Sequence, residues 1–116
     1  MQKNIFGKPL TLCSNNPLTG YTRNGYCHSD TVDHGMHMVC AKVTPEFLEF
    51  TKSRGNDLIT KTSYFPGLKP GDFWCLCAYR WLEAFNAGVA PPVLLEATHI
   101  EALKIIPLQY LFQYRL

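Results

Sequence analysis

The chain has 116 residues, of which 47% are hydrophobic and 17% charged, and its formal net charge is +2. This length predicts a single domain over residues 1–116 with a core of its own, and the apolar fraction excludes a disordered chain. Lys and Arg form no run, which argues against a nucleic-acid partner, and the apolar stretches are far shorter than the roughly 20 residues that span a bilayer, which argues against a membrane protein.

The first residues hold no apolar run of the kind that a secretory signal needs, so we expect a cytoplasmic protein. Five cysteines are an odd number, which cannot close into a complete disulfide framework. In a reducing compartment we therefore expect free thiols. Metal ligation and thiol chemistry are both compatible with this expectation.

The N-terminal third predicts turns and a hairpin. Residues Pro17–Gly20 have turn composition, and Asn24-Gly25 favours the type I′ turn that joins two twisted strands. We therefore expect a β-hairpin with arms at residues 21–23 and 26–28. A further strand is expected over residues His37–Val43.

A helix is predicted over residues Pro45–Arg54. Thr44 is a favourable N-cap and Pro45 suits the first helical position. Val43 and Leu48 stand where a hydrophobic staple places its two members. Gly55 follows as the residue that ends the helix.

Residues Phe73–Cys77 are apolar throughout and fit either of two structures. We favour a central strand followed by a helix over Ala78–Ala87, which Gly88 ends; the alternative is one continuous helix that begins just before Phe73. On a strand Cys75 and Cys77 share a face, whereas on a helix they point apart.

The C-terminal part predicts a strand over Val93–Ala97 and a short helix after Thr98, which forms a capping box with Glu101. Pro107 opens a last helix that we expect to pack on the body or on a second copy. Together the elements predict an α+β fold: a small mixed sheet with an N-terminal hairpin and three to four short helices.

The segment from Cys27 to Cys40 is the first candidate site, because it holds three of the four histidines, two thiols and two carboxylates. Thiolate and imidazole are the ligands that zinc and other transition metals prefer. The alternative is a polar loop with Cys40 as a small buried hydrophobe. The metal hypothesis draws its ligands from five residues: Cys27, His37, Cys40, Cys75 and Cys77.

The pair Cys75-x-Cys77 is the second candidate. On one strand face it could chelate a soft metal or act as a dithiol, while the alternative is two buried core cysteines. If Cys77 precedes a helix, it lies at a helix N-terminus, where a thiol becomes reactive, and Arg80 is close in sequence.

His99 is the third candidate. Just beyond a strand end, beside Glu96 and Thr98, it could serve as a general base near neutral pH. The alternative is a solvent-exposed histidine in the first turn of a helix. Cys77 and His99 are thus the two catalytic candidates.

The irregular stretch Gly55–Asp72 is the fourth candidate, because ordered loops of this length are often functional. Its flanking residues Asn56, Asp57 and Asp72, together with Thr98, are predicted ligand-binding residues. The alternative is that they cap and shape turns. In this hypothesis the loop is a lid over a pocket near Thr98 and His99.

Several short strings along the chain form a recognisable set: Pro17–Gly20, Val39–Ala41, Glu46–Leu48, Arg54–Leu58, Phe65–Leu68, Gly71–Asp72, Trp74–Ala78, Gly88–Pro92 and Glu96–His99. Together they resemble one bacterial family, catalogued as domain of unknown function twenty-two thirty-seven. The sequence departs from that family at Tyr26-Cys27, where two cysteines are usual, at Ser29–Thr31 and in a shorter loop before Phe65. The resemblance implies one coherent domain and carries no activity with it.

Three hypotheses for function follow, and whether the protein is an enzyme is left open. The first is a Cys/His site that binds zinc or another transition metal or performs thiol chemistry. The second is a metal-free module that binds a small ligand under the 55–72 loop. The third is a homo-oligomer that associates through the aromatic C-terminal helix.

Overall fold

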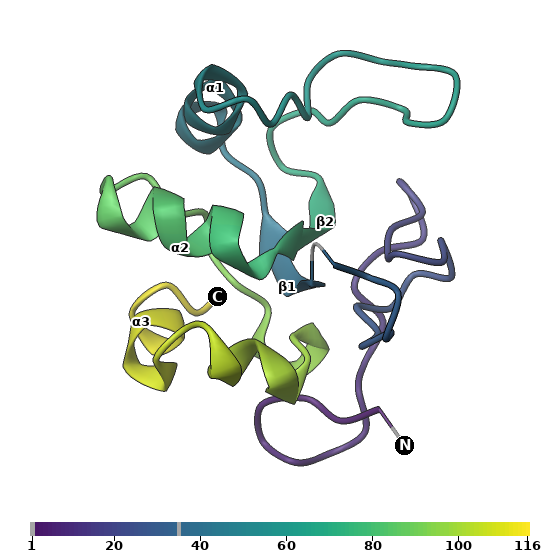
Figure 1. The fold of residues 1–116 in the computed structure, drawn as a ribbon, viewed down its shortest axis with the longest axis vertical. Coiled ribbons are helices and arrows are strands. Elements are labelled where there is room, and N and C mark those ends of the chain that lie inside the picture. The colour runs from purple at the N-terminus through teal and green to yellow at the C-terminus, as the bar shows by residue number, and fades with distance from the viewer. Residues whose placement is uncertain (1, 35) are drawn as a thin grey trace.

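The computed structural model describes residues 2–34 and 36–116. Its elements are β1 (His37–Lys42), α1 (Pro45–Ser53), β2 (Phe73–Cys77), α2 (Ala78–Asn86), the 3-10 helices η1 (Leu95–Ala97) and η2 (Ile100–Lys104), and α3 (Leu108–Gln113). The predicted α+β class is confirmed. Figure 1 shows α2 between α1 and α3, with the sheet beside it and the N-terminal coil on the far side of the sheet. Among the described residues no helix is long and apolar enough to cross a membrane.

Helix α1 begins as its sequence predicts. The hydroxyl oxygen of Thr44 accepts a hydrogen bond of 3.1 Å from the backbone N–H of Phe47, and Pro45 occupies the first turn. Phe47 and Leu48 are buried in the core. The helix ends at Ser53, and Gly55 follows with a φ of +93°, a conformation that glycine adopts without steric cost.

The prediction of a strand followed by a helix at residues 73–86 is also confirmed. Trp74 and Leu76 of β2 are buried in the main core. Trp81 of α2 is fully buried, and its indole N–H donates to the carbonyl oxygen of Pro91 at 3.1 Å. Both tryptophans are therefore core residues.

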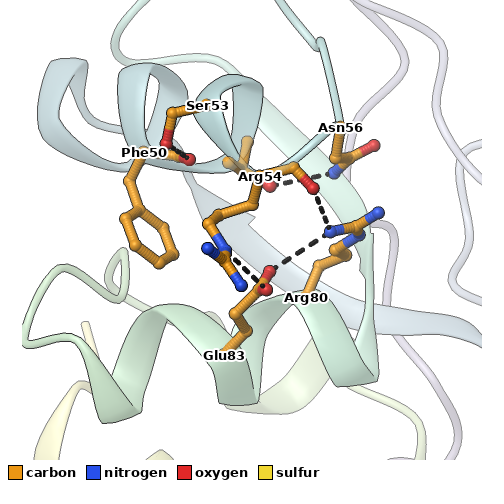
Figure 2. Close-up of polar contacts among 7 residues, drawn as sticks. Phe50, Ser53, Arg54, Asn56, Arg80 and Glu83 are labelled. Carbon is orange, nitrogen blue, oxygen red and sulfur yellow. Dashed lines mark hydrogen bonds and ion pairs between the residues drawn. The ribbon is translucent and has the colours of Figure 1, made fainter.

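Helices α1 and α2 are joined at their polar edge, which Figure 2 shows. The Glu83 carboxylate binds Arg54 and Arg80, each at 3.3 Å, and Arg80 also donates to the carbonyl oxygen of Arg54 at 3.1 Å. Two residues after Arg54, the Asn56 amide donates to the Thr51 hydroxyl at 3.1 Å. These contacts fix the point where the long loop leaves α1.

The predicted N-terminal hairpin is wrong, and the sheet is a two-stranded antiparallel one, not a mixed one. Gly25 does take a positive φ of +94°, so the Asn-Gly turn exists. Its backbone, however, pairs with an earlier segment: its N–H donates to Thr19, and its carbonyl oxygen accepts from Cys13 and Ser14. The Asn-Gly turn is therefore present, but it pairs with an earlier stretch of coil and not with the predicted arms.

The predicted strand at Val93–Ala97 is also wrong. Val93 forms only single bridges, to Ala41 and to Arg115, and the chain then enters η1. Thr98 does not cap the next helix, because its hydroxyl is already bonded to two backbone groups. His99 caps η2 instead, and its Nδ1 accepts from the backbone N–H of Glu101 at 3.0 Å.

The last helix begins after Pro107, as predicted, and packs on the body. Leu111 is fully buried in the core. The C-terminus is fastened by backbone hydrogen bonds: Val93 donates to Tyr114 at 2.8 Å, and Leu116 donates to Val93 at 2.9 Å. Helix α3 also contacts α2, because the ring of Tyr110 on α3 stacks on the ring of Phe85 on α2.

Candidate functional site

Four of the five cysteines form disulfides. Cys13 is bonded to Cys40 and Cys27 to Cys75, with Cα–Cα distances of 5.7 and 5.4 Å, and Cys77 is free. The expectation of free thiols is therefore wrong for four residues. The odd count leaves one thiol over but does not prevent the other four from pairing once the fold brings them together.

The two disulfides form one buried sulfur cluster. The sulfur atoms of Cys13, Cys27 and Cys75 all lie within 4.8 Å of one another. Cys40 is bonded to Cys13 and stands opposite Cys75 in the β1–β2 ladder. Three of the predicted metal ligands, Cys27, Cys40 and Cys75, thus converge. Apart from the disulfide partners, Ala97, Phe73 and Leu94 surround this cluster.

Two buried threonines hold the cluster in place. The hydroxyl oxygen of Thr19 accepts from the backbone N–H of Cys75 at 2.8 Å. The hydroxyl of Thr98 accepts from the backbone N–H of Cys40 at 3.2 Å and donates to the carbonyl oxygen of Leu94 at 3.0 Å. Thr98, predicted to bind a ligand, lies beside the sulfur cluster.

The other two predicted metal ligands, His37 and Cys77, form a second constellation. They are Cα partners at the end of the antiparallel ladder, a relationship that places Cβ atoms about 4.5–5.5 Å apart. The Nδ1 of His37 lies 2.7 Å from Oδ1 of Asp33, and the backbone N–H of His37 donates to Oδ2 of Asp33 at 2.9 Å. The Asp33 side chain is fully buried, so the surrounding residues hold the carboxylate in place, and the carboxylate in turn orients the His37 ring.

A β-bulge brings this histidine to the face of the thiols. The register shifts between His37 and Val39, so that His37 opposes Cys77 while Cys40 opposes Cys75. On a regular strand, residues three apart point to opposite faces, and His37 and Cys40 would have been separated. One extra residue reverses that relationship.

A cavity of about 490 Å³ opens next to His37. Its walls come from the N-terminal coil and from the loop at residues 55–72, which lie side by side in Figure 1. The lining residues are Gly20, Tyr21, Arg23, His37, Asp57, Leu58, Thr62, Tyr64, Phe65, Trp74 and Cys75. The loop thus lines a cavity, as the second hypothesis requires, but next to His37 and Trp74 instead of Thr98 and His99.

Cys77 lies in a small recess of about 50 Å³ beside this cavity. The recess shares four lining residues with the cavity: His37, Leu58, Trp74 and Cys75. Cys77 is also the N-cap of α2, as predicted, and its side chain forms no capping hydrogen bond. The first backbone N–H groups of a helix attract negative charge, and the Cys77 side chain stands beside them.

Two opposite charges stand on the cavity wall. The Arg23 guanidinium lies 4.9 Å from the centroid of the Trp74 ring and donates to the carbonyl oxygen of Gly20 at 2.6 Å. Hydrogen bonds from the side chain and backbone of Thr60 and from the backbone of Ile59 lower the pKa of Asp57 to about 2. The wall therefore offers a fixed cation and a fixed anion around an aromatic floor.

The remaining predicted residues are divided between the cavity and turns. Asn56 lines the recess. Asp72 accepts from the backbone N–H of Lys69 at 2.9 Å, which is a turn-making role. His99 lines neither cavity and is buried at the start of η2, where burial lowers its pKa.

Sequence reasoning missed several residues of these sites. Cys13 was not assigned to any candidate site, although the odd number of cysteines gave no reason to leave this one out. Asp33 lies four residues before His37, and on a strand this spacing predicts no contact between the two side chains. Their contact arises because a tight turn precedes His37. Arg23 and Thr19 act over distances that no local pattern reveals.

Comparison with known proteins identifies a family. The model of the family described as "Uncharacterized protein conserved in bacteria (DUF2237)" matches residues 3–115, nearly the whole chain. The chain belongs to this family, and the resemblance inferred from its sequence strings is confirmed. No curated protein matches the chain.

Proposed function

We propose that this member of a bacterial family performs nucleophilic thiol chemistry at Cys77 on a small molecule held in the adjoining cavity. The observation that carries the proposal is the cross-strand pair of Cys77 and His37, with the imidazole held by the buried carboxylate of Asp33. A nucleophile, a base and a group that orients the base are the three parts that activate a thiol.

Each part has a role in the proposed reaction. Because a carboxylate only accepts hydrogen bonds, Nδ1 of His37 donates its proton to Asp33, and Nε2 is left to accept a proton. When the Cys77 sulfur attacks an electrophilic carbonyl carbon, a C–S bond forms and the thiol proton passes to Nε2. The bond to the leaving group then breaks, and the leaving group takes that proton.

The cavity limits the substrate class. Four aromatic side chains, those of Tyr21, Tyr64, Phe65 and Trp74, offer flat apolar contact area. The Arg23 guanidinium, supported by the Trp74 ring, offers a partner for an anionic group. The substrate we infer is a small molecule with a flat apolar part, an anionic group that binds Arg23, and an activated carbonyl group.

The test uses two probes on the native, unreduced protein. Iodoacetamide modifies Cys77, measured by mass spectrometry, and p-nitrophenyl acetate gives a burst of one p-nitrophenolate per chain. His37→Ala slows both reactions by roughly 10²-fold or more, which is the usual contribution of a general base. Asp33→Asn slows them as well, because the ring loses its charged partner.

His34→Ala is the matched control, because His34 is an exposed histidine of the same segment. It leaves both rates unchanged. Equal rates in wild type and His37→Ala, or a burst that survives in Cys77→Ala, would show that the constellation has no chemical role.

A second candidate is a binding module without chemistry, favoured by the size and aromatic lining of the cavity. In that case Cys77→Ala binds a ligand as wild type does, and p-nitrophenyl acetate gives no burst. A screen of small aromatic carboxylates, read by the fluorescence of Trp74 at the cavity floor, separates the two candidates.

We also propose a cytoplasmic location, no nucleic-acid partner and self-association through α3. Disulfides are rare in a reducing cytoplasm, so a cytoplasmic location implies that the sulfur cluster spends time as thiols. A mass measurement by light scattering after size exclusion tests the oligomer.

A further inference from the structure

The sulfur cluster gathers cysteines from four separate segments of the chain. Three sulfur atoms, those of Cys13, Cys27 and Cys75, lie within 4.8 Å of one another, and the fourth, from Cys40, is bonded to the first. All four residues are buried, and none of them is exposed by more than 8%.

This arrangement matches what a zinc ion needs once the disulfides are reduced. Zinc takes four thiolates at about 2.3 Å in a tetrahedron, which places the sulfur atoms about 3.8 Å apart. All three sulfur atoms of Cys13, Cys27 and Cys75 lie within 4.8 Å of one another, and those of Cys27 and Cys75 are bonded. Once the two S–S bonds are broken, each bonded pair has only to separate to about 3.8 Å. We propose that the reduced protein binds one zinc ion through Cys13, Cys27, Cys40 and Cys75.

The surroundings support a closed, structural site. The hydroxyls of Thr19 and Thr98 fix the backbone of Cys75 and Cys40, so these two ligands are held in place without the disulfide bonds. Ala97 and its apolar neighbours line the cluster and exclude water. A four-thiolate site leaves no open coordination position, which is the pattern of a structural zinc and not of a catalytic one.

The set differs from the ligands predicted from the sequence. Cys13 takes the place of His37 and Cys77, which lie in the second constellation. The proposal is therefore independent of the proposed thiol chemistry, and each can fail without the other.

Reduction converts the disulfide state of the cluster into the thiol state that binds zinc. Each disulfide takes two electrons and two protons from a dithiol reductant, which becomes a disulfide itself, and yields two thiols. Zinc binding then releases one proton from each of the four thiols, because only thiolates ligate the metal. Oxidation by a disulfide oxidant reverses the sequence and expels the zinc.

The experiment compares oxidised and reduced protein that carries no histidine tag. Each form is incubated with zinc, passed through a desalting column and measured by elemental analysis. We expect one zinc per chain in the reduced protein and less than a tenth of an equivalent in the oxidised protein. Cobalt in place of zinc gives the visible absorption bands of a tetrahedral tetrathiolate site.

Alkylation identifies the ligands without any substitution. In the zinc-loaded reduced protein, iodoacetamide modifies Cys77 alone; after a chelator removes the metal, it modifies all five cysteines. Cys77→Ser, the matched variant, retains the zinc. The proposal is overturned if the reduced protein holds less than a tenth of an equivalent, if Cys77→Ser loses the metal, or if the four cluster thiols are modified equally with and without zinc.

Discussion

The hydroxyl oxygen of Thr19 accepts a hydrogen bond of 2.8 Å from the backbone N–H of Cys75, across 56 residues of sequence. Both residues are buried, so water cannot replace either partner. The bond fastens the N-terminal coil to β2 at the position of a disulfide. It also gives the coil, which has few regular elements, a defined place against the sheet.

Thr19→Val removes this acceptor while keeping the shape of the side chain. The buried N–H of Cys75 then has no partner, and the cost of such a group is about 1–3 kcal/mol of unfolding free energy. Urea denaturation of the oxidised protein measures the loss. Thr22→Val, at an exposed position of the same coil, changes stability by less than about 0.5 kcal/mol; equal effects of the two substitutions would contradict the role of the Thr19 bond.

The pairing of the cysteines predicts a thiol count. In denaturant without reductant, one thiol per chain reacts with Ellman's reagent, because only Cys77 is free. After complete reduction, five react. Peptide mapping of the unreduced protein recovers the pairs Cys13–Cys40 and Cys27–Cys75. A count of five before reduction would place the isolated protein in the thiol state instead.

Local signals explain which parts of the fold were predictable. Thr44 and Pro45 define the start of α1 through the backbone of the same few residues, so no distant partner is needed. The strand and helix at residues 73–86 follow from an apolar run that precedes an amphipathic one. Asn24-Gly25 also specifies its turn, but no hairpin forms there because the backbone of Gly25 bonds to earlier residues, Cys13, Ser14 and Thr19.

The candidate site was less predictable than the fold because its residues come from segments that are far apart in the sequence. The pool of thiols and imidazoles was correct in outline, since Cys27, Cys40 and Cys75 do converge. The division of these candidate residues into a sulfur cluster and a His37–Cys77 pair depends on the bulge beside His37, and no residue pattern predicts that bulge. The carboxylate of Asp33 became relevant only through a turn that folds it under the imidazole.

His99 predicts a dependence of stability on pH. Burial lowers its pKa, the positive charges of His28 and Lys104 lower it further, and Glu101 opposes them. Below about pH 6.5 the unfolded chain therefore binds a proton that the folded chain does not, so the contribution of His99 is complete above that pH and is lost as the pH falls.

Urea denaturation at about pH 5.5 and about pH 7.5 measures this dependence. His99→Asn, which retains a side-chain oxygen to cap η2, reduces the difference between the two conditions. His34→Asn, at an exposed histidine, leaves the difference as in wild type. A His99→Asn protein with an unaltered difference would assign the pH dependence to other groups.

Leu111 and Leu108 lie on the same short helix, α3, but we expect their replacement by alanine to reduce the free energy of unfolding by very different amounts. Leu111 is fully buried in the core, whereas Leu108 is 39% exposed. Leu111→Ala leaves a cavity against the body and costs about 2–5 kcal/mol, measured by thermal or urea unfolding. Leu108→Ala costs well under half of that, because much of its surface already meets water. If instead Leu108→Ala lowers the mass seen by light scattering, or costs as much as Leu111→Ala, then the exposed face of α3 is covered by a second copy of the chain.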